Sequence, residues 1–400
     1  MNKNLNKWQR SIIRNNMDKY RQALENYYIK DKPLVSVEHG YKAFSLLSPP
    51  LGSAAARRRI RLIMNNIIDE KTRVEPDGTV HWGTRTPHFM TMTVTYQCQC
   101  DCEHCSASAY MKEVLEARSA LTKDELKSAI RQTVDLGTTC TIFTGGEPLL
   151  YPHIYELIET VDKSKSVCTL FTNGEYLTRD TLTRLKSAGL FGVFVSLDHS
   201  DKDIHDKNRH RAGIYEKAIE GIRLCRQYGI LPGISTFVTK EKIACGELDA
   251  MMEIAKGLQV IEIFLFDVIA TGKLEARHNQ MLSSDEVDYI KEFRKKYNER
   301  PQYPRIIHQT MFTSIAYPCA AEGCPAGVAQ MHLRGNGDVT PCDFTPLSFG
   351  NIRKEPIELI WQKMTESDLY CRSAKKCRLS DPHMWSKIHQ INRLQPQNTL

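Results

Sequence analysis

The chain has 400 residues, of which 41% are hydrophobic and 25% are charged, with 22 Gly and 17 Pro. This composition is that of an ordinary folded protein and excludes a disordered, collagen-like or coiled-coil chain. No apolar run approaches the roughly 18 residues of a membrane helix, and the first residues lack the hydrophobic stretch of a secretory signal. We therefore expect a cytoplasmic protein without a membrane partner.

Charge and cysteine are distributed in opposite ways along the chain. Residues 1–90 hold 16 Lys and Arg against 8 Asp and Glu, and this excess accounts for the formal net charge of +7. All 13 cysteines follow residue 97. An odd number of thiols in a chain of intracellular type indicates metal ligation or redox work rather than a disulfide framework.

Residues 1–88 form the first predicted domain, a basic helical extension. Apolar residues recur every three to five positions between residues 8 and 27, which predicts an amphipathic helix. A second helix is expected after Ser53 as its N-cap. One side of that helix carries Arg57, Arg58, Arg59 and Arg61. Such a cluster is either a solvated face or a site for an acidic partner, a peptide, phosphate or nucleic acid.

Six β-rich runs alternate with helical stretches in residues 89–300, the second predicted domain. The runs are residues 89–96, 139–145, 167–173, 192–198, 233–239 and 260–269. This alternation predicts parallel strands joined by right-handed crossovers, in an open or barrel-shaped sheet. In parallel barrels chemistry gathers at the C-terminal ends of the strands. We therefore expect the polar strand tips to converge at one mouth.

Three cysteines follow the first predicted strand in Cys-x3-Cys-x2-Cys spacing: Cys98, Cys102 and Cys105. Three thiolates on a short loop can bind three irons of a four-iron cluster and leave the fourth iron open to a ligand. Cys100 lies in the same loop, so four thiolates could instead hold a tetrahedral zinc ion. The spacing alone leaves both metals open.

The next three strands end in glycine-rich or polar tips. These tips are Gly145-Gly146-Glu147-Pro148, Thr172-Asn173-Gly174 and Ser196-Leu197-Asp198, and His205-Asp206-Lys207-Asn208-Arg209 leads into the next helix. Together with the three-cysteine loop, these motifs resemble the radical S-adenosylmethionine (radical SAM) superfamily over about residues 89–270. The resemblance implies a partial (β/α)6 TIM barrel of the α/β class, with a [4Fe-4S] cluster on the three cysteines that binds S-adenosylmethionine.

The same resemblance implies which side chains bind the cofactor. They are Gly145, Gly146, Glu147, Pro148, Ser196, Asp198, Arg209 and His104. The glycines let the backbone approach a ligand closely, and the guanidinium of Arg209 is suited to the carboxylate of the cofactor. Asp198 would bond the ribose or cap the following turn. His104 stands where many members have an aromatic residue, and Cys100 has no role in the family pattern.

Residues 301–400, the third predicted domain, have too little apolar sequence for a large core, which indicates a metal-stabilised fold. Cys324, Gly337 and Cys342 have the spacing of a SPASM domain or of its short form, Twitch. That resemblance implies one auxiliary [4Fe-4S] cluster on Cys324 and Cys342, with two or more of Cys319, Cys371 and Cys377. Asp381 as a ligand and a zinc-stabilised hairpin are the alternatives. Asp343 matches a proton acceptor of the sulfatase-maturating branch, which makes it the expected catalytic base.

These resemblances imply an oxidoreductase that accepts an electron from a flavodoxin- or ferredoxin-type donor. It would cleave S-adenosylmethionine reductively to a 5′-deoxyadenosyl radical, which removes hydrogen from a substrate. A ribosomally made peptide is the leading substrate class, because the basic extension could hold an acidic leader. The alternative is a dehydrogenase, epimerase or decarboxylase acting on a small molecule, a sugar or tetrapyrrole. A non-catalytic iron–sulfur or zinc protein is the second alternative, and we do not expect a nucleic-acid partner.

Overall fold

The computed structural model describes residue 18 and residues 32–67, 69, 71–75, 79–108, 111, 119–275, 277–311 and 322–394. The helix expected between residues 8 and 27 therefore lies outside the described residues, apart from residue 18. None of the described helices is both long and apolar enough to cross a membrane.

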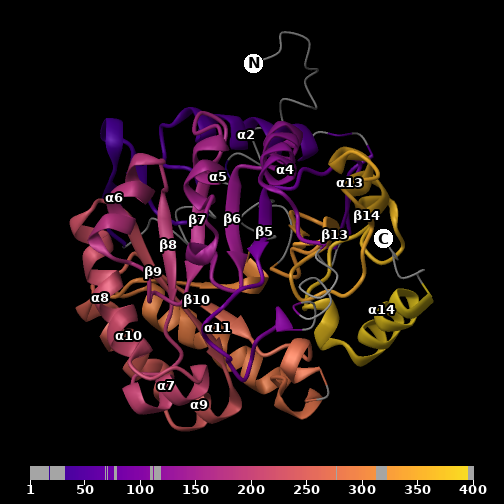
Figure 1. Ribbon diagram of the computed structural model, residues 1–400. Helices are drawn as coiled ribbons and strands as arrows, with labels where there is room; N and C mark the ends of the chain where they lie inside the picture. Colours follow the sequence, from indigo (N-terminus) through magenta and orange to yellow (C-terminus); the bar gives the residue numbers. More distant parts are fainter. Residues whose placement is uncertain are drawn as a thin grey trace.

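The centre of the molecule is one ten-stranded sheet (Figure 1). Eight neighbouring strands of this sheet run parallel, and the first seven have the order β11-β10-β9-β8-β7-β6-β5. Their bounds are β5 Phe89–Thr95, β6 Cys140–Gly145, β7 Val167–Thr172, β8 Gly192–Ser196, β9 Leu231–Val238, β10 Glu262–Asp267 and β11 Arg305–His308. The six expected strands are present, and β11 adds a seventh. Its run of four residues is too short for a period to be recognised in the sequence.

The parallel part of the sheet curves into a partial barrel. Phe171 on β7 and Phe264 on β10 are separated in the sheet by two further strands, β8 and β9. Neighbouring strands lie about 4.8 Å apart, so a flat sheet would hold these residues roughly 14 Å apart. Their ring centroids are only 5.9 Å apart. The partial-barrel fold expected from the sequence is therefore confirmed.

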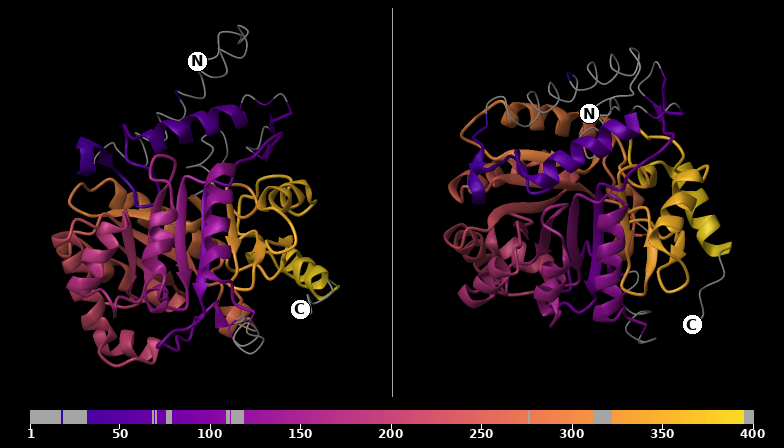
Figure 2. Two further views of the ribbon diagram at one scale, coloured as in Figure 1. Left: turned by 45° about the horizontal axis from the view of Figure 1, so that its top comes forward. Right: turned by 90° about the horizontal axis from the view of Figure 1, so that it is seen from above.

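Helices cover the outer face of the barrel (Figures 1 and 2). On β5, Met90 and Met92 pack toward these helices, whereas Phe89 and Thr91 face the interior, as the two-residue period of a strand requires. The helices that bury an apolar stripe on this face are α4 Lys123–Leu136, α5 Ile154–Thr160, α6 Arg179–Ser187, α8 Ile214–Gln227, α10 Glu247–Gly257 and α11 Ser284–Asn298. Two shorter helices, α7 Lys202–Arg209 and α9 Lys240–Ala244, follow the C-terminal ends of β8 and β9.

The C-terminal part continues the same sheet. Strand β12 pairs in parallel with β5, and β13 and β14 follow it in antiparallel pairing. Trp361 on α13 joins the core between the sheet and its helices. The bounds are β12 Gln330–Leu333, β13 Asp338–Thr340, β14 Gly350–Asn351, α13 Ile357–Glu366 and α14 Pro382–Leu394. Strand pairing thus fixes the later cysteines to the barrel, while the domain limits at residues 88 and 300 stay predictions.

The N-terminal segment closes the end of the barrel where the parallel strands begin. The side chain of Leu46 fills the space that a Cβ atom would need at Gly192 and Gly233. The buried carboxyl group of Glu262 accepts hydrogen bonds from the Leu46 amide (2.7 Å) and from Ser45 Oγ (3.2 Å). Burial raises the pKa of Glu262 to about 8. The described elements here are β1 Val35–Ser36, β2 Lys42–Ala43, α2 Ala54–Ile67, β3 Arg73–Val74 and β4 Val80–His81.

Two of the four clustered arginines on α2 are structural. The guanidinium of Arg59 is buried over the Phe89 ring and donates to the carbonyl oxygen of Leu47 at 3.1 Å. Arg58 donates to the carbonyl oxygens of Val134 and Thr138, at the end of α4 and just beyond it. Only Arg57 and Arg61 remain as exposed members of the cluster. The surface that could hold an acidic partner is therefore smaller than the sequence indicates.

Candidate active site

The three-cysteine loop lies at the C-terminal ends of the parallel strands. Cys98, Cys102 and Cys105 line one cavity there, together with Cys100. The backbone N–H of Asp101 donates to the carbonyl oxygen of Arg209 at 3.2 Å, which ties the loop to the end of α7. The mouth expected from the sequence is therefore where the thiols meet.

The thiols of this loop influence each other. A hydrogen bond with Cys100 lowers the pKa of Cys98 and, together with the nearby Arg209, lowers the pKa of Cys102 to about 7 despite burial. Burial raises the pKa of Cys105. Within the described part of the chain, no three His, Cys, Asp or Glu side chains are arranged to hold a single metal ion. Hydrogen bonds of Cys100 with Cys98 and Cys102 hold three thiols of this loop close together.

Gly145 and Gly146 press against the end of β5. A Cβ atom at Gly145 would lie 2.2 Å from the carbonyl oxygen of Thr95, and one at Gly146 would lie 2.3 Å from that of Gln97. Gly145 also has a φ angle of 142°, a conformation that residues with a side chain rarely adopt. Both glycines line the thiol cavity. The absence of a side chain thus lets the tip of β6 lie directly beside the start of the cysteine loop.

Glu147 and Pro148 lie behind the wall of this cavity and do not line it. The fully buried Glu147 carboxyl group accepts hydrogen bonds from the backbone amide of Asn173 (2.8 Å) and from Thr172 Oγ1 (2.9 Å). Burial raises the pKa of Glu147 to about 7. The observed contacts of Glu147 join the tips of β6 and β7. A direct cofactor contact of Glu147 or Pro148 stays a prediction.

Asp198 and Arg209 form a buried ion pair on the cavity wall. Arg209 Nε lies 2.8 Å from Asp198 Oδ2, and a second guanidinium nitrogen lies 3.1 Å from Oδ1. Burial alone would raise the pKa of Asp198, but Arg209 and the nearby His104 hold it well below its usual range. Burial lowers the pKa of His104 to about 4, and its ring packs against Phe237 at 4.4 Å between centroids. Ser196 also lines this cavity, so six of the eight residues expected to bind the cofactor lie at one site, and their contact with the cofactor stays a prediction.

A second cavity lies among the later cysteines. Cys324, Cys342 and Cys377 line it. A hydrogen bond with Cys377 lowers the pKa of the buried Cys324 to about 5. Cys371 is outside this lining, and its Sγ atom lies 3.8 Å from the carbonyl oxygen of Asp368. The structure thus brings together three of the five expected auxiliary ligands.

Two other residues considered as auxiliary ligands have different positions. Cys319 lies outside the described residues. Asp381 precedes α14, and its Oδ1 atom accepts a hydrogen bond from the Met384 amide at 2.9 Å. Its observed contact is therefore that of a helix cap.

The two cavities meet at three shared residues: Phe266, Asp343 and Phe344. The rings of Phe266 and Phe344 lie 6.3 Å apart, and that of Phe171 lies 5.8 Å from Phe266. Burial raises the pKa of Asp343 to about 6. We call this aromatic space between the two thiol sets the central chamber. Asp343, expected as a catalytic base, is the carboxyl group that both cavities share.

The phenylalanines of the central chamber were not among the residues predicted from the sequence. Phe171, Phe237 and Phe266 lie near the C-terminal ends of β7, β9 and β10. Their inward position follows from the two-residue period of each strand once the register is known. The sequence alternation could therefore have located these phenylalanines, but only with the limits of each strand known to within one residue.

The fold and the two thiol sets define an iron–sulfur enzyme built on a partial parallel barrel. Residues 92–240 match the family model of the radical SAM superfamily, and residues 324–380 match that of the SPASM iron–sulfur cluster-binding domain. The chain is accordingly a radical SAM enzyme with a SPASM domain, and its cofactors are S-adenosylmethionine and iron–sulfur clusters.

Named relatives differ in what they act on. The chain is 27% identical over 279 residues to the AdoMet-dependent heme synthase of Nitratidesulfovibrio vulgaris. This match covers 65% of this chain and 75% of the relative. It is 29% identical over 265 residues to the AdoMet-dependent heme synthase of Methanosarcina barkeri, covering 60% and 73%. Among solved structures, Streptococcus suis SuiB bound to the precursor peptide SuiA has the same fold. Its TM-score is 0.56 at 17% identity, over 76% of this chain and 68% of that one.

Proposed function

We propose that this enzyme oxidises a small molecule with a planar conjugated ring, of the tetrapyrrole class. The observation that carries the proposal is the central chamber, in which phenylalanine rings and the Asp343 carboxyl group lie between the two thiol sets. Aromatic side chains favour offset or edge contacts with other flat rings, so they suit a planar substrate. Both sequence relatives described above are named heme synthases, which supports the same substrate class.

Residues of this chain would bind the cofactors, orient the substrate and accept a proton. S-adenosylmethionine, bound to a cluster reduced by a flavodoxin- or ferredoxin-type donor, supplies hydrogen-atom abstraction. Cys98, Cys102 and Cys105 would hold the catalytic cluster. Cys324, Cys342 and Cys377 would hold the auxiliary cluster, which would supply the acceptor for the second electron of the oxidation. The phenylalanines would orient the substrate and exclude water.

Asp343 would take a proton from the substrate. A general base must lie within reach of the reacting group, and the position of Asp343 between the two thiol sets supports this role. In Asp343→Asn we expect substrate turnover to fall by about 10² or more, because proton transfer of this kind contributes about 10²–10⁴ to a rate. Binding of S-adenosylmethionine, measured by equilibrium dialysis, should stay within twofold of wild type. Undiminished turnover in this variant would remove the base role from Asp343.

Peptide modification is the second candidate function. The fold shared with SuiB, whose structure contains a precursor peptide, favours it. The basic extension supports this function less than its sequence suggests, because Arg58 and Arg59 bind this chain's own carbonyl oxygens. A leader held by the extension would also lie at the end of the barrel opposite the thiols.

Anaerobic reconstitution with two substrate sets separates the candidates. One set contains iron-loaded and metal-free porphyrins with carboxylate side chains, and the other contains short peptides encoded beside this gene. We expect a porphyrin to raise the yield of 5′-deoxyadenosine. The mass of that porphyrin should fall by the mass of the hydrogen or carbon dioxide that it loses. A Cys98→Ala variant with the SPASM cysteines intact is the control and should form neither product. Stimulation by a peptide and by no porphyrin would overturn the tetrapyrrole proposal.

A further inference from the structure

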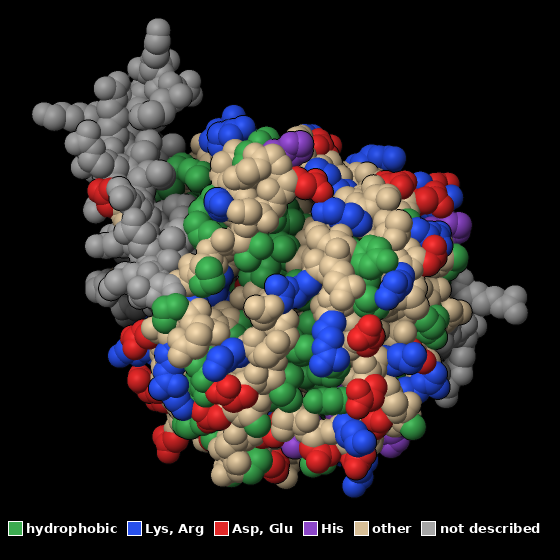
Figure 3. Space-filling model, turned by 90° about the vertical axis from the view of Figure 1, so that its left-hand side faces the viewer, with side chains coloured by type: hydrophobic (Ala, Val, Ile, Leu, Met, Phe, Trp, Pro, Cys, Tyr) green, Lys and Arg blue, Asp and Glu red, His purple; other side chains and the backbone are tan. Residues whose placement is uncertain are grey.

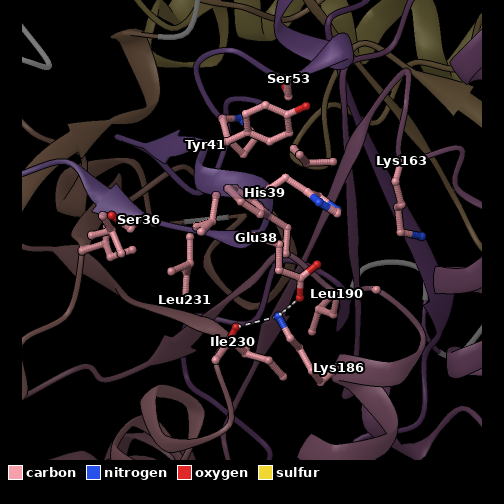
Figure 4. A pocket seen from close by; sticks show the side chains of 18 of the residues that line it. Ser36, Glu38, His39, Tyr41, Ser53, Lys163, Lys186, Leu190, Ile230 and Leu231 are labelled. Atoms are coloured by element: carbon pink, nitrogen blue, oxygen red, sulfur yellow. Dashed lines mark hydrogen bonds and ion pairs between the residues drawn. The ribbon is translucent and has the colours of Figure 1, made fainter.

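A cavity of about 640 Å³ lies at the closed end of the barrel, away from all the candidate ligands. Its walls are the segment around β1 and β2 and the loops that precede β7, β8, β9 and β10. Figure 4 shows Glu38, His39 and Tyr41 of the first wall opposite Lys186 and Leu190 of the second. Small-molecule sites in proteins commonly measure about 300–1,000 Å³, so this cavity is large enough for one.

The floor of this cavity is apolar and buried. Leu190 and Ile230 are only 2% and 1% exposed, and Val167 is 7% exposed. On the face of the molecule that carries this segment, hydrophobic side chains are visible among Lys and Arg side chains (Figure 3). A floor of this kind offers mainly apolar contacts to a ligand.

The rim carries an excess of positive charge. Lys163, Lys186 and Arg226 line the cavity, and Glu38 is their carboxylate neighbour. Glu38 forms an ion pair with Lys186, with 2.7 Å between Oε1 and Nζ, and this pair lowers the pKa of Glu38. Within the described residues, the other two cations, Lys163 and Arg226, donate their hydrogen bonds to uncharged acceptors. Lys163 donates to the carbonyl oxygens of Ile158 and Val161, and Arg226 donates to the side-chain oxygen of Gln259.

We propose that this cavity binds a small amphipathic anion, with its apolar body on the floor and a carboxylate or phosphate head at the basic rim that Lys163 and Arg226 line. Both heads suit the donors of lysine and arginine. The preceding part of the chain is a poor occupant by charge, because residues 1–31 contain seven Lys and Arg against three Asp and Glu. A ligand here would also brace the segment that carries Leu46 into the barrel.

The ligand of this cavity is distinct from the substrate. Val167 and Leu231 of the lining are the first residues of β7 and β9, whereas the catalytic thiols follow the C-terminal ends of the strands. The eight residues of β9 span about 26 Å at 3.3 Å per residue. The bound anion would therefore act as an effector or anchor for the fold.

Calorimetric titration of the reconstituted full chain tests this site with three probes. Dodecanoate and dodecyl phosphate are used below their critical micelle concentrations, and dodecanol is used below its solubility limit. We expect saturable binding of at least one anion, at least tenfold tighter than dodecanol. The Lys163→Glu, Arg226→Glu double variant should weaken anion binding at least tenfold and change dodecanol binding less than twofold. Lys165→Glu, a nearby lysine outside the cavity that pairs with Asp135, is the matched control and should bind as wild type.

A second variant separates loss of the site from loss of the fold. Val35→Trp places a larger side chain in the cavity wall and should weaken all three probes, while the melting temperature and 5′-deoxyadenosine formation stay at the wild-type values. Failure of both anions to saturate the wild-type protein would overturn the proposal. Wild-type anion binding by the double charge variant would overturn it as well.

Discussion

The Asp198–Arg209 pair shows how single residues shape the cofactor cavity. In Asp198→Asn the guanidinium of Arg209 stays buried without its counter-charge, and breaking a buried ion pair costs about 3–5 kcal/mol. We expect urea denaturation to show a loss of unfolding free energy of that size. Equilibrium dialysis should show S-adenosylmethionine binding at least tenfold weaker. Arg211→Ala breaks an exposed pair with Glu175 and should change neither quantity appreciably. An Asp198→Asn protein with wild-type cofactor affinity would show that the pair is only structural.

Glu262 makes the stability of the closed end depend on pH. Its pKa is raised by burial from 4.5 to about 8. A group with a raised folded pKa contributes its full stability below the unfolded pKa, and this contribution is lost as pH rises toward the folded value. The unfolding free energy of wild type should therefore fall between about pH 5 and pH 8 relative to Glu262→Gln, by a few kcal/mol. Parallel curves for the two proteins over this range would show that Glu262 is ionised at neutral pH.

At the scale of elements, the end of β6 positions the thiol loop. Gly146→Ala would place a Cβ atom 2.3 Å from the Gln97 carbonyl oxygen, so the backbone on one side must move. We expect this variant to bind fewer irons at the first thiol set and to bind S-adenosylmethionine at least tenfold more weakly. Iron analysis and equilibrium dialysis measure these effects. The control is Gly257→Ala, at the end of α10 with no atom within 4 Å of the new methyl group, which should leave both unchanged. Normal iron content in Gly146→Ala would contradict the packing argument.

The strand tips could be predicted from the sequence because their chemistry depends on local order. The thiols, the glycine pair and Asp198 follow their strands directly, so a correct strand assignment also locates them at the mouth. The burial of Glu147 could not be predicted in this way. Its contacts with Thr172 and Asn173 depend on the exact pairing of β6 with β7.

At the scale of the whole molecule, the parallel barrel could be predicted from the sequence. The two long-range contacts that complete it could not. The insertion of Leu46 beneath Gly192 joins residues far apart in the chain, and apolar periodicity carries no information on such a contact. For the same reason the sequence did not indicate that β12 would pair with β5 and bring Asp343 beside the first thiol set. Long-range pairing, rather than local propensity, thus decides how the two clusters are related.

The central claim is that two separate thiol sets hold two clusters in one radical SAM enzyme. Iron analysis after anaerobic reconstitution tests it most directly, in wild type and in two triple alanine variants, one of Cys98, Cys102 and Cys105 and one of Cys324, Cys342 and Cys377. With four irons in each cluster, we predict about eight irons per wild-type chain and about four in each variant. Only proteins with the first set intact should bind S-adenosylmethionine at their iron. About four irons in wild type, with none lost on removing the second set, would contradict the account.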